Sequence, residues 1–195
     1  MKISEIKEYL VSIKPYITFS CYTFLVSAIL GYIFAQNNPN EITKFLEEIK
    51  SLFPIDEEST PFQIFLFIFE NNVSKIFLLL PLGIFAGIFP LLFIFTNGLV
   101  FGIFAQVSSS LISWKFFVLG IAPHGIIEIP VLIIATAISL KIGKVAVWKI
   151  FKKDKKFLSE FSKAIKFYIF VLLPLLFIAA LIEAYITPIF ISLSL

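Results

Sequence analysis

Long runs of apolar residues constrain this chain more than any other feature. They cover residues 16–35, 73–112, 117–140 and 167–188, and an apolar run of about 20 residues crosses a bilayer as a helix. The composition agrees, since 59% of the residues are hydrophobic and only 15% are charged, against about 25% charged in soluble domains. The sequence predicts an all-α polytopic membrane helix bundle, with residues 1–195 forming a single membrane domain.

The expected helix boundaries follow from where polar residues and prolines interrupt these runs. Residues 1–14 predict an amphipathic surface helix, and Pro15 is expected to open the first crossing. The apolar stretch 61–70 is too short to span, so it predicts an interfacial or re-entrant helix. Thr96-Asn97-Gly98 is expected to break the tract 73–112 in two, because Asn-Gly favours turns. About five transmembrane helices result, near residues 16–35, 73–95, 98–113, 117–140 and 167–188.

Charge predicts how these helices sit in the membrane. All 16 basic residues are lysines, and nine of them fall in residues 141–166, whereas residues 36–61 are acidic. Cytoplasmic loops of membrane proteins carry the excess of basic residues. We therefore expect a plasma-membrane protein with a basic cytoplasmic loop at 141–166 and an acidic outer loop at 36–61. Five crossings then place the N-terminus in the cytoplasm and the C-terminus outside.

A few polar side chains stand at the depth of the apolar runs, where they are costly and usually have a task. His124 and Glu128 are four residues apart, so they share one helix face, and Glu183 in the last run is expected to converge with them. Two readings stay open: a polar lock that holds helices together, or a proton path, ion path or ligand site. The candidate intramembrane polar cluster comprises Asn72, Asn97, His124, Glu128 and Glu183.

Two pairs of glycines have the spacing of close helix contacts. Gly83 and Gly87 form one pair, and Gly98 and Gly102 form the other. Glycines four residues apart clear one helix face and let another backbone approach. We expect these faces to pack within the chain, with self-association as the alternative.

Several function classes find no support in the residues. A single histidine makes a catalytic zinc site improbable, and the one cysteine, Cys21, excludes an intrachain disulfide. The chain contains no H-E-x-x-H, G-x-S-x-G or P-loop motif. The lysines cluster beside the apolar runs, a pattern that suits membrane topology and not nucleic acid. The sequence therefore predicts a protein that is not an enzyme and has no metal or cofactor.

The polar and glycine positions together resemble a known family. The order of Asn71-Asn72, Asn97-Gly98 with Gly102, Pro123-His124-Gly125-x-x-Glu128-x-Pro130, and Ile182-Glu183-Ala184 with Thr187-Pro188 is similar to the stage II sporulation protein M family of integral membrane proteins. The resemblance implies a membrane protein of about five helices. In spore formers the namesake acts as an anchor or scaffold beside peptidoglycan-degrading partners.

Two functional hypotheses follow. The first is a non-enzymatic scaffold or subunit of a membrane complex, whose partners are the lipid bilayer and other membrane proteins or further copies of itself. The alternative is a proton- or ion-coupled transporter or channel that uses the His/Glu/Asn cluster. An intramembrane enzyme is a distant third, which a metal bound at His124 would revive.

Overall fold

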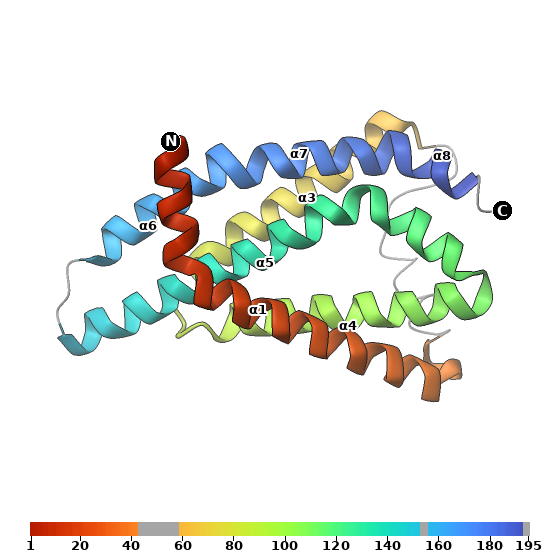
Figure 1. Ribbon diagram of the computed structural model, residues 1–195, viewed down its shortest axis with the longest axis horizontal. Coiled ribbons are helices and arrows are strands. Elements are labelled where there is room, and N and C mark those ends of the chain that lie inside the picture. Colours follow the sequence, from red (N-terminus) through yellow and green to blue (C-terminus); the bar gives the residue numbers. More distant parts are fainter. Residues whose placement is uncertain (43–58, 153–155, 193–195) are drawn as a thin grey trace.

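The computed structural model describes residues 1–42, 59–152 and 156–192, and all the elements it contains are helices (Figure 1). They are α1 (Ile3–Asn37), α3 (Pro61–Leu82), α4 (Ile88–Leu111), α5 (Trp114–Lys152), α6 (Lys156–Phe167), the π-helix η1 (Tyr168–Leu172), α7 (Leu173–Leu181), the π-helix η2 (Ile182–Ile186) and α8 (Thr187–Ser192). The segments from α6 to α8 follow one another without a break and form one long rod. The predicted all-α class is confirmed.

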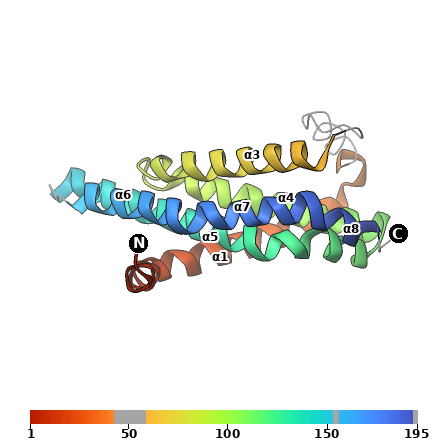
Figure 2. The same ribbon diagram turned by 90° about the horizontal axis from the view of Figure 1, so that it is seen from above.

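Five of these helical stretches are long and apolar enough to cross a membrane. They cover residues 3–37, 61–82, 88–110, 125–148 and 157–192. The five rods run back and forth along the long axis of the molecule, as both ribbon views show (Figures 1 and 2). Their outer surfaces carry many exposed Phe, Ile and Leu side chains, as expected where hydrocarbon is the solvent. The chain is an integral membrane protein.

The first helix differs from expectation at its start. Residues 1–14 do not form a separate helix, because α1 continues from Ile3 to Asn37 with Pro15 inside it. The ribbon bends sharply after its first turns, so the start of α1 lies across the bundle and the rest lies along it (Figure 1). Tyr9 and Ile13 in this first part are buried, and the Tyr9 ring lies 5.3 Å from that of Phe167 at the end of α6.

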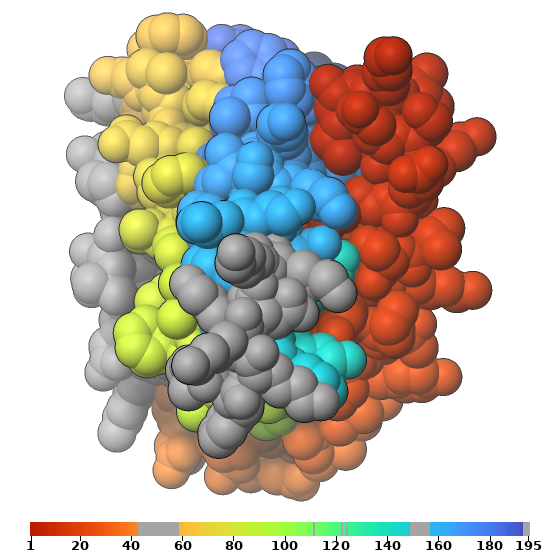
Figure 3. Space-filling model, turned by 90° about the vertical axis from the view of Figure 1, so that its left-hand side faces the viewer, coloured from red at the N-terminus to blue at the C-terminus, as the bar shows by residue number. Residues whose placement is uncertain are grey.

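An ion pair and a hydrogen bond hold the start of α1 in place. The Lys141 ammonium lies 2.7 Å from a Glu160 carboxylate oxygen, donates a 3.0 Å hydrogen bond to the Ser12 hydroxyl, and lies 5.1 Å from the centre of the Tyr9 ring. The space-filling view onto this end shows the N-terminal part of α1 beside α6 (Figure 3). One lysine therefore joins three segments far apart in the sequence.

The segment 61–70 is not an interfacial or re-entrant helix. It is the first half of α3, which runs through Glu70, Asn71 and Asn72 to Leu82 and is long enough to span. The Thr60 side chain caps its start by accepting a hydrogen bond from the Gln63 amide, and Pro61 takes the first helical position. Asn71 and Asn72 did not end the helix, because their side chains line a polar cavity inside the bundle, whereas Glu70 is exposed on the outer face of α3.

The turn between the second and third crossings lies at residues 83–87, and the expected break at Thr96-Asn97-Gly98 is wrong. Asn97 and Gly98 lie inside α4, which continues to Leu111. The chain reverses instead at Ala86 and Gly87, whose φ angles are +54° and +79°. Gly87 adopts this left-handed conformation without cost, because it has no Cβ. The predicted number of crossings was still right. The second crossing ends earlier than expected, at Leu82, but it also begins earlier, at Pro61, so it remains long enough to span the membrane.

The fourth and fifth crossings extend beyond their apolar runs. α5 contains Pro123 and Pro130, and the ribbon arches in this region (Figure 1), since a proline inside a helix frees a carbonyl and bends the backbone. The stretch 141–166, expected as a basic loop, is largely helical, because α5 continues to Lys152 and α6 begins at Lys156. Most of the expected acidic loop 36–61 lies outside the described residues.

The core is apolar and concentrated in the half of the bundle nearer the α5–α6 connection. α3, α5, η1 and α7 supply its largest fully buried side chains, with Phe167 and Ile13 beside them: Leu80, Val131, Ile138, Ile142, Leu172 and Leu176. A buried hydrogen bond crosses this core, because the Ser139 hydroxyl donates to the Leu79 carbonyl oxygen at 2.6 Å. This core closes one end of the cavity that lies further along the bundle.

The predicted glycine faces pack inside the chain. α1 makes its most extensive packing contact with α4. A Cβ on Gly98 would overlap the Ser27 hydroxyl, and one on Gly102 would overlap the Ala28 carbonyl. A Cβ on Gly83 would likewise overlap the Ser139 carbonyl of α5, and a Cβ on Gly87 would lie 3.0 Å from the Leu140 side chain.

Candidate functional site: a polar cavity in the bundle

Four helices bring polar side chains to one place near the middle of the bundle. Asn72 lies midway along α3, Asn97 lies in the central part of α4, and Glu128 lies at the arch of α5. Glu183 lies in η2, within the last crossing. These positions are far from the ends of their helices, so the side chains lie at membrane depth, where polar groups need partners or water.

These side chains face a cavity of about 470 Å³. The polar residues that line it are Asn71, Asn72, Lys75, Asn97, Glu128, Glu183 and Thr187. The apolar lining includes Ile76, Phe93, Val131 and Leu176 at one end and Ile64 and Ile191 at the other. A cavity of this size holds several water molecules or a small solute.

Glu128 is the centre of the electrostatic contacts in this cavity. The Asn72 side-chain amide faces the same cavity as the Glu128 carboxyl and acts on it, as does the positive charge of Lys75. The negative charge of Glu128 in turn acts on Glu183 in the neighbouring η2. Two carboxyls, one ammonium and several amides therefore share one space inside the bundle.

Local backbone features position the two carboxyls. Pro130 follows Glu128 by two residues and leaves a helical carbonyl of α5 without its usual N–H donor. Glu183 lies in η2, where the Thr187 amide bonds to the Ile182 carbonyl five residues earlier and the Thr187 hydroxyl lies 3.3 Å from that oxygen. Such π-helical turns are frequent at functional sites.

The remaining predicted residues differ in what they contribute. The Asn97 side-chain nitrogen donates a 2.7 Å hydrogen bond to the Phe93 carbonyl of its own helix, and Asn97 still lines the cavity. His124 lies in α5, one helical turn before Glu128, but its side chain lies outside the described part of the structure. The structure thus brings Asn72, Asn97, Glu128 and Glu183 together.

The cavity extends toward one end of the bundle. Its lining follows α3 from Ile76 back to Ile64 and follows the last crossing from Leu176 to Ile191. Ile76, Val131 and Leu176 also belong to the apolar core, which fills the bundle beyond them. The cavity therefore reaches from the middle of the bundle toward the end where α3 begins, and packed apolar side chains block it in the other direction.

Sequence reasoning missed Lys75 as part of this site. Lys75 follows Asn72 by three residues, the spacing at which two side chains share a helix face. This spacing is informative only if Asn72 and Lys75 belong to the same helix, as they do in α3. Among the described residues, no group of three His, Cys, Asp or Glu side chains is placed to hold a metal ion.

Comparison with known proteins identifies the family. The family description "Stage II sporulation protein M" matches residues 20–188, which include every residue that lines the cavity except Ile191. An uncharacterized protein of Methanocaldococcus jannaschii is 29% identical over 171 residues, covering 85% of this chain and 89% of the relative. No solved structure matches the chain. The chain is a member of the stage II sporulation protein M family of membrane proteins.

Proposed function

We propose that this protein moves protons or small cations across the membrane through the cavity around Glu128 and Glu183. The observation that carries this proposal is that both carboxyls line a cavity of about 470 Å³ and not a packed contact. A polar lock between helices needs no such space, whereas a transport site does. The sequence alone favoured a scaffold, and the cavity is our reason for proposing transport first.

The charges around the cavity favour a cation. With Glu128 and Glu183 both ionised, Lys75 balances one of the two negative charges, and one proton or one monovalent cation restores neutrality. The amides of Asn71, Asn72 and Asn97 offer oxygens that can replace water around a bound cation. An anionic solute would meet two carboxyls, so we exclude it from the proposal.

The helices around the cavity have the irregularities common in transporters. α5 arches around Pro123 and Pro130, and the last crossing contains two π-helical stretches. Interrupted helices beside ionisable groups are a recognised pointer to transport sites, because they free backbone groups at membrane depth. A cavity blocked at one end by the apolar core fits a protein that opens to one side of the membrane at a time.

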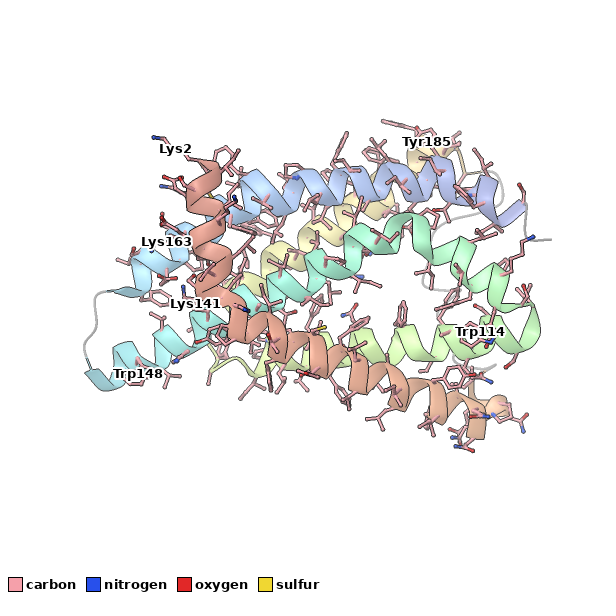
Figure 4. The ribbon with its side chains drawn as sticks, in the orientation of Figure 1. Lys2, Trp114, Lys141, Trp148, Lys163 and Tyr185 are labelled. Atoms are coloured by element: carbon pink, nitrogen blue, oxygen red, sulfur yellow. The ribbon has the colours of Figure 1, made fainter. Side chains whose placement is uncertain are left out.

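The orientation of the protein belongs to the same proposal. The end of the bundle that carries Lys141, Lys163 and Trp148 lies opposite the end that carries Trp114 (Figure 4). If the lysine-rich end faces the cytoplasm, as the basic bias of cytoplasmic loops predicts, the N-terminus is inside, the C-terminus is outside, and the cavity extends toward the outer face.

A liposome flux assay tests this proposal. The purified protein is reconstituted with a pH-sensitive dye inside the vesicles, and separately with radioactive Na⁺ or K⁺ outside, under an imposed potential. We expect flux above that of empty liposomes, and at least a tenfold reduction in Glu128→Gln and Glu183→Gln. The matched control is Glu41→Gln, because Glu41 is exposed and lies outside the cavity lining.

The outcome that overturns the proposal is equally definite. Flux equal to that of empty liposomes for protons, Na⁺ and K⁺ would exclude transport of these cations. Normal flux in both glutamine variants would show that the two carboxyls take no part in it. Circular dichroism and gel filtration of each variant establish that the fold is intact.

A scaffold or subunit of a membrane complex is the second candidate, and the outer face of α3 favours it. Glu70 and Ser74 are exposed on this face near the middle of the helix, and an exposed polar side chain at that depth favours contact with another helix. Affinity purification from native membranes tests it, and a lack of any stable partner counts against it.

That the protein is not an enzyme stays a prediction.

A further inference from the structure

The outer face of α3 carries polar side chains where lipid is expected. Glu70 and Ser74 are exposed in the central part of α3, and Gln63 is exposed near its start. α3 lies along one edge of the bundle, with the other helices on its opposite side (Figure 2). Its main contacts go to α5, α7, η2 and, to a small extent, α4, and Tyr168 of η1 contacts Val73 and the Phe77 ring near the end of α3. The face that contains Glu70 contacts none of these helices closely enough to be covered.

This arrangement is costly in a single copy of the protein. Glu70 lies about 13 Å from the nearer end of α3, at 1.5 Å per residue, which is further than its side chain reaches. A carboxyl that faces hydrocarbon at this depth costs a few kcal/mol. Glu70 does not line the cavity around Glu128, so the proposed transport site does not explain it. A second helix that covers Glu70 would remove most of this cost.

The spacing of these residues is that of a helix–helix contact. Gln63, Glu70, Ser74 and Phe77 follow one another at intervals of seven, four and three residues, and we call this row the α3 seam. Intervals of three and four keep side chains on one face of a helix that packs along another helix. Phe77 is 47% exposed, so the seam combines polar groups with an aromatic side chain that lacks full cover.

We propose that the α3 seam is the interface between two copies of this protein. Copies inserted with the same orientation hold their α3 helices parallel, and a twofold axis along the membrane normal places each seam against the other. The seam carries donors and acceptors in one row, because Ser74 donates, Glu70 accepts and Gln63 does both. Two identical seams can therefore satisfy each other reciprocally, as a symmetric interface requires.

Within this dimer the central contacts involve Glu70 and Ser74. The Ser74 hydroxyl of each copy donates to the Glu70 carboxyl of the other, one helical turn away. The aromatic ring of Phe77 packs across the axis. A partner helix without a donor near Glu70 would leave that carboxyl unsatisfied, whereas a second copy brings its own Ser74 and Gln63, so the second copy is the occupant that fits best.

Cysteine cross-linking in liposomes tests the interface directly. In a Cys21→Ser background, Ser74→Cys is expected to give a disulfide-linked dimer on mild oxidation. Val100→Cys is the matched control, because Val100 is 46% exposed near the middle of α4 on another face, and it is expected to remain monomeric. Equal cross-linking at the two positions, or at Val100 alone, overturns the proposal.

Single-molecule photobleaching in dilute bilayers measures the contribution of Glu70. Glu70→Leu is expected to weaken dimerisation at least tenfold, whereas Glu70→Gln retains a donor and an acceptor and is expected to keep it. Single bleaching steps for the wild type at every dilution would overturn the proposal. So would cross-linking of Ser74→Cys in native membranes to a different protein only. None of these readouts depends on flux, so this proposal and the transport proposal can fail separately.

Discussion

The Lys141 ammonium and the Glu160 carboxylate, 2.7 Å apart, join α5 to α6 beside the start of α1. Both side chains are mostly buried, with 15% and 16% of their surfaces exposed. Removing one partner leaves the other charge poorly solvated, so Lys141→Ala or Glu160→Ala is expected to cost about 1–3 kcal/mol. Thermal unfolding in detergent measures this loss.

A double-mutant cycle isolates the ion pair from the other contacts of Lys141, which include the Ser12 hydroxyl and the Tyr9 ring. We expect the double variant to lose less than the sum of the single variants. The control is Lys163→Ala, because Lys163 is 55% exposed and lies 3.4 Å from Glu160, so its removal is expected to cost less than about 0.5 kcal/mol. Strictly additive losses would contradict a direct coupling.

Ser139 is expected to stabilise the contact between α5 and α3. Its hydroxyl donates to the Leu79 carbonyl oxygen at 2.6 Å inside the apolar core. Ser139→Ala removes this bond between helices, and we expect a loss of about 0.5–1.5 kcal/mol in unfolding by denaturing detergent. Thr23→Ala serves for comparison, since the Thr23 hydroxyl bonds only within its own helix, to Phe19. An equal loss in both variants would contradict the assigned role of Ser139.

Gly98 is expected to be far less tolerant of a methyl group than Gly120. A Cβ at Gly98 would overlap the Ser27 hydroxyl of α1, whereas the nearest atom to a Cβ at Gly120 is the Ile191 side chain at 3.8 Å. Gly98→Ala must push α1 and α4 apart, at a cost of about 1–3 kcal/mol, while Gly120→Ala is expected to be neutral or slightly stabilising. The midpoint of thermal unfolding for each variant checks this. Equal midpoints would mean that α1 and α4 lie further apart than the structure places them.

A cation that binds between Glu128 and Glu183 is expected to raise the unfolding temperature. A ligand at 100 times its dissociation constant stabilises the folded state by about 2.7 kcal/mol. Titrating Na⁺, K⁺ and Li⁺ at constant ionic strength, with choline as the replacement, separates binding from screening. The shift should vanish in Glu128→Gln and persist in Glu41→Gln. A shift that is the same for all four cations would indicate screening alone.

Much of the fold could be read from the sequence, because bilayer thickness sets the length of each apolar run. This argument gave the number of crossings correctly, although it placed the turn between the second and third crossings at the wrong residues. Asn97-Gly98 looked like a turn, but Gly98 serves the contact with Ser27, and the chain reverses at Ala86 and Gly87 instead. A local preference for a turn is overridden where the packing of a neighbouring helix requires a small residue at the same position.

The site was predictable in its members but not in its geometry. Asn72, Glu128 and Glu183 stand out because polar residues at membrane depth are few. The sequence does not distinguish polar side chains packed against one another from polar side chains that line a cavity. That difference depends on how far apart the four helices lie at this depth. Lys75 escaped notice because the second crossing was predicted to begin at residue 73, which separated Lys75 from Asn72, whereas both lie in α3.

The two π-helical stretches of the last crossing have a consequence for its register. In each, a backbone amide reaches five residues back: Leu173 to Tyr168, and Thr187 to Ile182. Such a stretch accommodates one more residue than an α-helix of the same height. Deleting a single residue there, such as Tyr185, would restore regular α-helical winding and leave the helix beyond it in nearly its present rotation. A deletion in the regular part, within α7, would instead rotate everything beyond it by about 100° and turn Glu183 away from the cavity.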